Sequence, residues 1–97
     1  MRRSKLEIHM DILKALGYHG PIRITHIMHK ANVCFCLLEE YLSFLIRQGL
    51  VAQETLSEGT AVYAITKRGR QVLRCFRELN IALHGREEIL KIRELLY

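Results

Sequence analysis

The hydrophobic positions near the N-terminus recur at the spacing of an amphipathic helix. Ser4 and Glu7 form the capping-box pattern that opens such a helix, and Gly17 is expected to end it. The apolar face of this helix comprises Leu6, Ile8, Ile12, Leu13 and Leu16. Pro21–Ile24 then predicts a short extended piece, because a proline at its first position needs no backbone donor.

Two further helices are predicted in the middle of the chain. Thr25 is expected to cap a short helix over residues 26–31, and Asn32 suits the left-handed residue of the tight turn that follows. A third helix runs from residue 33 or 34 to Gln48, and Gly49 ends it. Its inward face recurs at helical spacing and comprises Leu38, Tyr41, Leu42 and Leu45.

A hairpin and a long helix complete the pattern. Leu50–Leu56 and Thr60–Ile65 are apolar or β-prone stretches on either side of Ser57-Glu58-Gly59, which indicates a hairpin with a short tip. Thr66 is expected to cap a fourth helix that continues to the C-terminus. The order of elements predicts a mostly helical (α+β) fold, a winged helix-turn-helix with a two-stranded wing and a long C-terminal helix.

This last helix carries the most regular apolar pattern in the chain. Apolar residues repeat every seven positions from Phe76 to Tyr97 and, one position earlier, from Cys75 to Leu96. Such a repeat favours a coiled-coil seam, so we expect a winged domain over residues 1–66 and a homodimerisation helix over residues 67–97. The expected dimer interface comprises Cys75, Phe76, Leu79, Ala82, Leu83, Gly85, Ile89, Leu90 and Leu96. The alternative is a face packed on the domain's own core, which would account for the repeat only as far as Leu79.

Gly85 has two interpretations within this helix. A glycine in a helix interior costs about 1 kcal/mol relative to alanine, so its presence needs a reason. Gly85 is either a C-cap, after which a separate final helix starts, or, with Ala82, a point where two helices approach closely. The close approach is the preferred interpretation.

Composition and charge add a partner class to this architecture. The chain has 97 residues, 49% of them hydrophobic and 26% charged, which suits one small globular domain. No apolar run of about 18 residues predicts a membrane span. Six basic and two acidic residues give residues 1–30 a net charge of +4, residues 66–97 also carry +4, and residues 31–65 carry −3. Basic ends around an acidic middle permit polyanion binding.

The start of the fourth helix offers the best candidate contacts to double-stranded DNA. Its cations Lys67, Arg70, Arg74 and Arg77 are spaced by three, four and three residues, which places them on one helical face that matches a run of phosphates. The alternative is a solvated outer face. The expected DNA-binding residues, including flanking cations, are Arg2, Arg3, Arg23, His26, Lys30, Phe35, Arg47, Lys67, Arg68, Arg70 and Arg74.

The third helix would be the recognition helix of this fold, yet its outer face contains Glu39 and Glu40 and a single cation, Arg47. A carboxylate facing phosphate lowers affinity, although glutamate accepts hydrogen bonds from cytosine and phenylalanine contacts a thymine methyl group. This helix is therefore either a recognition helix or a packing helix whose outer face meets something other than DNA.

Several motifs together resemble those of a known family. The matching segments are Lys5-Leu6-Glu7-Ile8, Asp11-Ile12-Leu13, Ile24-Thr25, Ile27-Met28, Tyr41-Leu42, Leu45, Gly49-Leu50, Tyr63, Ile65-Thr66 and Gly69. In their order and spacing they resemble the small archaeal 10a-type winged-helix DNA-binding proteins, whose long helix pairs as an antiparallel coiled coil. The resemblance implies a dimeric, chromatin-like or regulatory DNA-binding protein of the cytoplasm, associated with the nucleoid. The start of the third helix, polar in related chains, is Cys34–Leu38 here, which argues against sequence-specific base readout.

Other chemistries find little support. His26, His29, Cys34 and Cys36 lie within eleven residues but do not have a known zinc spacing, and buried or idle thiols are the expected role of the three cysteines. No serine has a plausible catalytic setting, so the chain is not expected to be an enzyme. No cofactor and no metal are expected either. The membrane surface is not an expected partner. The alternative function is a winged helix that binds a basic protein partner through its acidic third helix.

Overall fold

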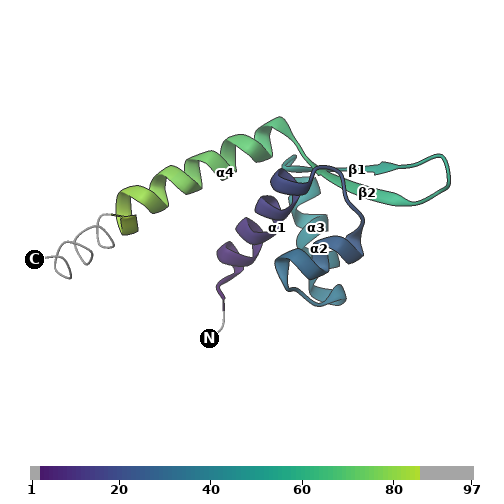
Figure 1. Cartoon of the computed structure of the whole chain (residues 1–97), viewed down its shortest axis with the longest axis horizontal. Helices are drawn as coiled ribbons and strands as arrows, with labels where there is room; N and C mark the ends of the chain where they lie inside the picture. Colours follow the sequence, from purple (N-terminus) through teal and green to yellow (C-terminus); the bar gives the residue numbers. More distant parts are fainter. Residues whose placement is uncertain (1–2, 86–97) are drawn as a thin grey trace, which may run out of the picture.

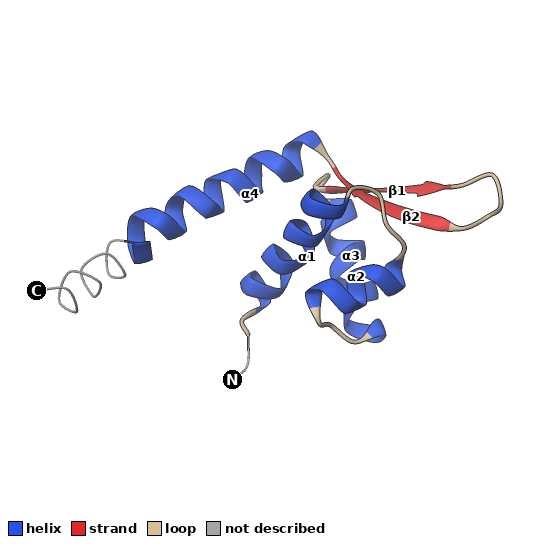
Figure 2. Cartoon of the chain, in the orientation of Figure 1, coloured by secondary structure: helices blue, strands red, loops and turns tan. Residues whose placement is uncertain are grey.

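Three helices, a hairpin and a further helix follow one another along the chain, of which the computed structural model describes residues 3–85 (Figure 1). The elements are α1 (Lys5–His19), α2 (Ile24–Ala31), α3 (Phe35–Arg47), β1 (Val51–Thr55), β2 (Ala61–Ile65), α4 (Lys67–Asn80) and the π-helical turn η1 (Ile81–Gly85). The strands pair antiparallel, with Val51 opposite Ile65, and extend from the helices as a wing (Figure 2). The predicted winged helix-turn-helix is therefore confirmed.

The start of α1 is as predicted, and its end is not. The Ser4 hydroxyl accepts a hydrogen bond from the Glu7 N–H (3.1 Å), and the Glu7 carboxylate accepts one from the Ser4 N–H (3.3 Å). The helix continues through Gly17 to Gly20, which has a φ of 72° and donates its N–H to the Leu16 carbonyl (3.0 Å). The helix ends at Gly20 because this glycine adopts the positive φ at which most other residues are strained.

Helix α2 begins earlier than predicted. Its N-cap is Arg23, which makes no capping hydrogen bond with its side chain, and Thr25 lies inside the first turn. Ile22 forms a single antiparallel bridge with Tyr63, and both backbone hydrogen bonds of that bridge are present (3.1 and 2.8 Å). The extended piece therefore reduces to a tether between α1 and the wing. Asn32 adopts the predicted left-handed conformation, with φ 53° and ψ 55°.

Helix α3 ends at Gly49 in a Schellman motif. Gly49 has a φ of 75°. The N–H of Leu50 donates to the Leu45 carbonyl (2.9 Å), and the N–H of Gly49 donates to the Ile46 carbonyl (3.0 Å). This turn reverses the chain into β1, as the sequence pattern predicted.

Thr66 connects the turn after α3 to the start of α4. Its hydroxyl donates to the Gly49 carbonyl (2.7 Å) and accepts from the N–H of Gly69 (3.0 Å). One side chain thus satisfies an unpaired amide at the helix start and fixes the direction in which α4 leaves the wing.

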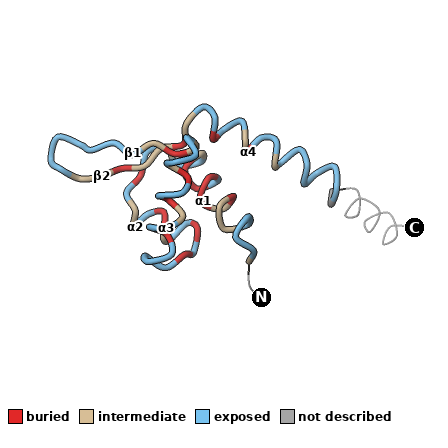
Figure 3. The backbone as a smooth tube through the Cα atoms, turned by 180° about the vertical axis from the view of Figure 1, so that it is seen from behind, coloured by how far each residue is buried: buried red, intermediate tan, exposed pale blue. Residues whose placement is uncertain are grey.

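The core lies where α1, α2 and α3 meet (Figure 3). It consists of Met10, Ile12, Leu13, Leu16, Ile22, Ile27, Ala31, Val33, Leu38, Leu42, Leu45, Val51, Ile65 and Leu73. Leu73 brings α4 into the same core, while most of α4 is exposed. Of the helices in the described part, none is long and apolar enough to cross a membrane.

Gly17 of α1 and Gly69 of α4 both lie close to neighbouring elements, but only one of them has room for a Cβ atom. A Cβ on Gly69 would collide with the Leu50 carbonyl oxygen and lie 2.7 Å from Ile65 Cγ1. A Cβ on Gly17 would be 3.5 Å from Leu73 Cδ2, an ordinary van der Waals distance. Only Gly69 is therefore required by close packing.

His9 joins α1 to α3 through aromatic contacts. Its ring centroid lies 4.6 Å from that of Tyr41 and 5.1 Å from that of Phe44. Its Nε2 atom is buried and has no hydrogen-bond partner in the described part of the chain. Burial, and to a smaller extent the positive charge of Lys5, lower the pKa of His9 below its usual value of 6.5.

We expect the free energy of unfolding to decrease as the pH falls from about 7.5 to about 5. The unfolded chain takes up a proton on His9 near the usual pKa, whereas the folded chain takes it up only at lower pH. The contribution of neutral His9 to the free energy of unfolding is therefore fully present above pH 6.5 and decreases below it. Urea denaturation at both pH values measures the effect. In a His9→Phe variant, which keeps an aromatic ring beside Tyr41, the decrease should be smaller; an equal decrease would assign it to other groups.

Candidate nucleic-acid interface

The outer face of α3 is acidic and apolar. Leu38, Leu42 and Leu45 point inward and are buried. The exposed residues are Phe35, Cys36, Leu37, Glu39, Glu40, Ser43, Phe44 and Arg47. Arg47 lies in the last turn, away from the N-terminal residues that a recognition helix presents to base edges. This face therefore offers little positive charge to phosphate.

The three cysteines were expected to be buried or idle thiols; all three are exposed, so burial is wrong, and an idle role stays a prediction. Cys34 is the N-cap of α3, Cys36 lies on the outer face of the same helix, and Cys75 lies on an exposed face of α4. Each is a free thiol. Within residues 3–85, no three His, Cys, Asp or Glu side chains form a group that could hold a metal ion.

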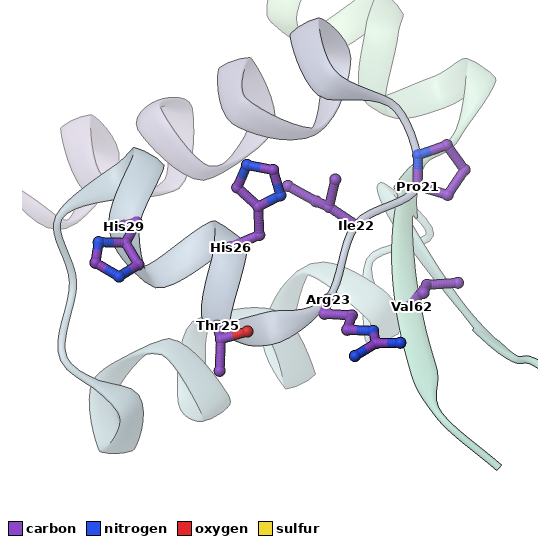
Figure 4. Close-up of a pocket in the computed structure, with 7 residues that line it drawn as sticks. All are labelled: Pro21, Ile22, Arg23, Thr25, His26, His29 and Val62. Carbon is purple, nitrogen blue, oxygen red and sulfur yellow. The ribbon is translucent and has the colours of Figure 1, made fainter. Parts of the chain in front are cut away.

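A polar groove separates α2 from the wing (Figure 4). Its volume is about 600 Å³, and its lining, here called the α2–wing groove, comprises Pro21, Ile22, Arg23, Thr25, His26, His29 and Val62. Figure 4 shows Arg23, just before α2, and Val62 of β2 bordering the groove. Arg23 forms an ion pair with Glu58 at the wing tip (3.3 Å), in which both side chains are more than half exposed. Such a pair is weak and leaves Arg23 available to a phosphate.

A second groove runs between the C-terminal part of α1 and α4, from the first turn of α4 to its last. Its lining, here called the basic groove, comprises Lys14, Gly17, Tyr18, Arg70, Leu73, Arg74 and Arg77. Gly17 and the buried Leu73 form an apolar floor, and the exposed cations surround it. Tyr18, 86% exposed, lies among them. None of these lining residues is acidic, so the groove concentrates positive potential.

A third concavity connects the basic groove to α2. Lys14 and Tyr18 line it as well, together with His19, Lys30 and the paired Arg3 and Asp11. The ring of His19 in turn lies 5.5 Å from that of His26, measured between centroids. Cationic and aromatic side chains thus follow one another from α4 across α1 to α2.

Arg3 has partners within the domain. Its guanidinium forms an ion pair with Asp11 (2.6 Å) and donates to the carbonyls of Ala31 (2.7 Å) and Asn32 (2.6 Å). These bonds tie the N-terminus to the end of α2, where a cation also interacts favourably with the helix dipole. Its predicted DNA contact stays a prediction, as does that of Arg2, which lies outside the described residues.

The structure groups four of the other sequence-predicted residues in two places. Arg23 and His26 line the α2–wing groove, and Arg70 and Arg74 line the basic groove with the stripe residue Arg77. Lys67 and Arg68 are exposed in the first turn of α4. Lys14 and Tyr18 were missed by the sequence analysis. Their four-residue spacing signals a shared face of α1, but only the fold places that face beside the arginines of α4.

An apolar cleft separates the other halves of α1 and α4. Its apolar lining is Leu6, Met10, Phe76, Leu79 and Leu83, and its polar rim is Ser4, Glu7, Asp11, Lys14 and Asn80. Leu79 is 56% and Leu83 59% exposed, and Phe76 is partly buried against the core. Gly85 lies in η1, and the predicted interface residues Ile89, Leu90 and Leu96 lie outside the described residues.

The structure is similar to several solved structures. Sso10a-2, a DNA-binding protein from Sulfolobus solfataricus, matches with a TM-score of 0.68 and 26% identity, over 98% of each chain. The transcriptional regulator BldR from the same organism matches with a TM-score of 0.62 and 23% identity, over 92% of this chain and 71% of its own. A probable transcriptional regulator from Pseudomonas aeruginosa matches with a TM-score of 0.65 and 18% identity, over 92% of this chain and 76% of its own.

The matches to BldR and to the Pseudomonas aeruginosa regulator, at 23% and 18% identity, show a shared fold alone. None of the curated proteins matches the sequence. A family model, described as winged helix-turn-helix, matches residues 2–83, which cover the three-helix core, the wing and α4. That family is one of non-enzymatic, regulatory domains. With four-fifths of its length matched, this chain belongs to the winged helix-turn-helix family.

Proposed function

We propose that the protein is a homodimeric double-stranded DNA-binding protein, architectural or regulatory, which holds DNA mainly through phosphate contacts. The observation that carries this proposal is the distribution of exposed charge. Cations and histidines gather in the basic groove and the α2–wing groove, whereas the outer face of α3 has two glutamates and one arginine. Affinity that comes from the flanks of α3 depends little on base sequence, because phosphates are common to every sequence.

The comparisons support this proposal at the level of DNA binding. Sso10a-2, which is similar over almost the whole of both chains, is a DNA-binding protein. The two regulators quoted above share the fold. A role in chromatin architecture and a role in transcription both suit a small basic winged helix, and weak sequence preference favours the first.

The dimer is supported by the two faces of α4. Arg70 and Leu79 are nine residues apart, which at about 100° per residue places them on opposite sides of the helix. A partner helix that covers Leu79 and Leu83 would leave the cationic face of α4 free. Dimerisation and phosphate binding are therefore compatible on one helix.

Removing one phosphate-contacting cation is expected to reduce the salt dependence of binding. An Arg70→Ala variant should lower the slope of log affinity against log salt by about one unit, on random and genomic duplexes alike. Fluorescence anisotropy at several salt concentrations measures the slope. Glu39→Gln, on the outer face of α3, is the control and should leave the slope unchanged. Loss of binding to one sequence in a Phe35→Ala or Glu39→Gln variant, with random-sequence affinity intact, would instead establish direct base readout.

A protein-interaction module is the alternative function, and the exposed apolar residues of α3 favour it. Phe35, Leu37 and Phe44 are 45%, 43% and 39% exposed beside Glu39 and Glu40. Aromatic side chains with acidic neighbours suit a basic protein partner. Absence of duplex binding at low salt would select this alternative, whereas affinity that falls steeply with salt would exclude it.

A further inference from the structure

The basic groove and the outer face of α3 lie on opposite sides of the domain. His9 packs from α1 onto Tyr41 and Phe44 of α3. Tyr18 is nine residues further along α1, which is a rotation of about 180° around the helix axis. Tyr18 therefore points away from α3. On α3, the exposed face lies opposite the buried Leu38, Leu42 and Leu45, and only its edge at Phe44 contacts α1.

The wing also points away from the basic groove. The wing and α4 extend toward opposite ends of the molecule from their junction at Thr66 (Figure 1). The α2–wing groove is on the wing side of α2, whereas the basic groove is formed by α1 and α4 without a residue of α2, α3 or the strands. The two grooves therefore share no lining residue, and the third concavity, on the side of α1 and α2, lies between them.

The chemistry of the basic groove suits the backbone of a nucleic acid. Lys14 contributes a point charge, and the three arginines contribute guanidinium groups that bind phosphate oxygens in pairs. Arg70 to Arg77 spans about 10 Å along α4, at about 1.5 Å per residue, enough to follow more than one phosphate. The hydroxyl of the exposed Tyr18 adds a donor of the kind that positions DNA backbones.

We propose that the basic groove is a second duplex-binding surface, so that one protomer holds two DNA duplexes on opposite sides. The first duplex contacts the α2–wing groove and α3, and the second contacts Lys14, Tyr18, Arg70, Arg74 and Arg77. A single duplex would have to bend around the domain to reach both, which costs free energy because DNA has a persistence length of about 150 bp. This inference rests on the proposed function, since it adds a second surface for the same ligand.

The number of duplexes bound per protomer tests the proposal. Sedimentation velocity of the full chain, saturated with a duplex of about one helical turn, is expected to give two duplexes per protomer, whatever the oligomeric state. Arg74→Ala with Arg77→Ala should reduce this to one, and so should Arg23→Ala with His29→Ala. The control, Lys5→Ala, removes an exposed cation that lines neither groove and should keep two. Circular dichroism confirms that each variant is folded.

Other results would overturn the proposal and identify what replaces it. One duplex per protomer in the unaltered chain would reject the second surface. A longer duplex whose end-to-end distance shortens on binding, measured by energy transfer, would show one bent duplex instead. Loss of all duplex binding in the Arg74→Ala, Arg77→Ala variant would make the basic groove the sole surface. If the unaltered chain bound no duplex at low salt, the proposed function itself would fail.

Discussion

Replacing Gly69 with alanine is expected to lower the free energy of unfolding by about 2–3 kcal/mol. The new Cβ would overlap the Leu50 carbonyl oxygen and crowd Ile65 Cγ1, 2.7 Å away. The first is a backbone atom held by the Thr66 N–H (3.0 Å), so it cannot move without weakening the junction between the wing and α4. This cost exceeds the gain of about 1 kcal/mol that alanine brings to a helix interior. Urea denaturation measures the difference.

Gly17→Ala is the matched control for this prediction. It makes the same substitution inside a helix, at a place where the Cβ would meet Leu73 at an ordinary contact distance. The free energy of unfolding should therefore rise by about 0.5–1 kcal/mol, from helix propensity alone. If both substitutions shifted stability in the same direction, the collision at Gly69 would not be the determining factor.

The elements that the sequence predicts well are those specified by local chemistry. The capping box at Ser4, the left-handed Asn32 and the cap at Thr66 depend on residues within one or two turns. The Schellman turn at Gly49 is equally local, because its bonds join residues three and five positions apart. Helical spacing then identifies Leu38, Leu42 and Leu45 as the buried side of α3.

The misassigned positions depend on contacts between distant segments. Gly17 lies inside α1 with Leu73 of α4 and Ile65 of β2 close to it, and its sequence neighbours do not reveal those contacts. Arg23, not Thr25, caps α2 because the bridge between Ile22 and Tyr63 ends the extended piece early. Cys36 is exposed because the core of α3 is already filled by leucines, so a small apolar residue is not needed inside.

The candidate site was predictable in part for the same reason. The regular spacing of Lys67, Arg70, Arg74 and Arg77 identified a cationic face of α4 from the sequence. Its combination with Lys14 and Tyr18 required knowledge of how α1 and α4 pack. Arg3 belonged to the predicted basic footprint by charge, yet its geometry gives it three partners inside the domain.

Placing charges in the apolar cleft is expected to convert the dimer to a monomer. In a Leu79→Glu, Leu83→Glu variant, four carboxylates per dimer would enter the apolar seam between the two helices, a cost that a coiled coil of this length does not offset. Sedimentation equilibrium at micromolar concentration should give twice the chain mass of 11.4 kDa for the unaltered protein and the single mass for the variant. Gln71→Glu, at an exposed position of α4, should remain dimeric.

The folded winged domain makes this variant informative. Leu79 and Leu83 are more than half exposed, so the domain's own core loses little when they change, and a monomer should keep its helical circular dichroism. Each monomer would also retain the basic groove, because those residues lie on the other faces of α4 and on α1. Affinity for a single short duplex should then persist while avidity for long DNA falls. An unaltered chain that sediments as a monomer would contradict the coiled-coil interpretation. The heptad repeat of residues 75–97 would then have to be explained by contacts within one chain.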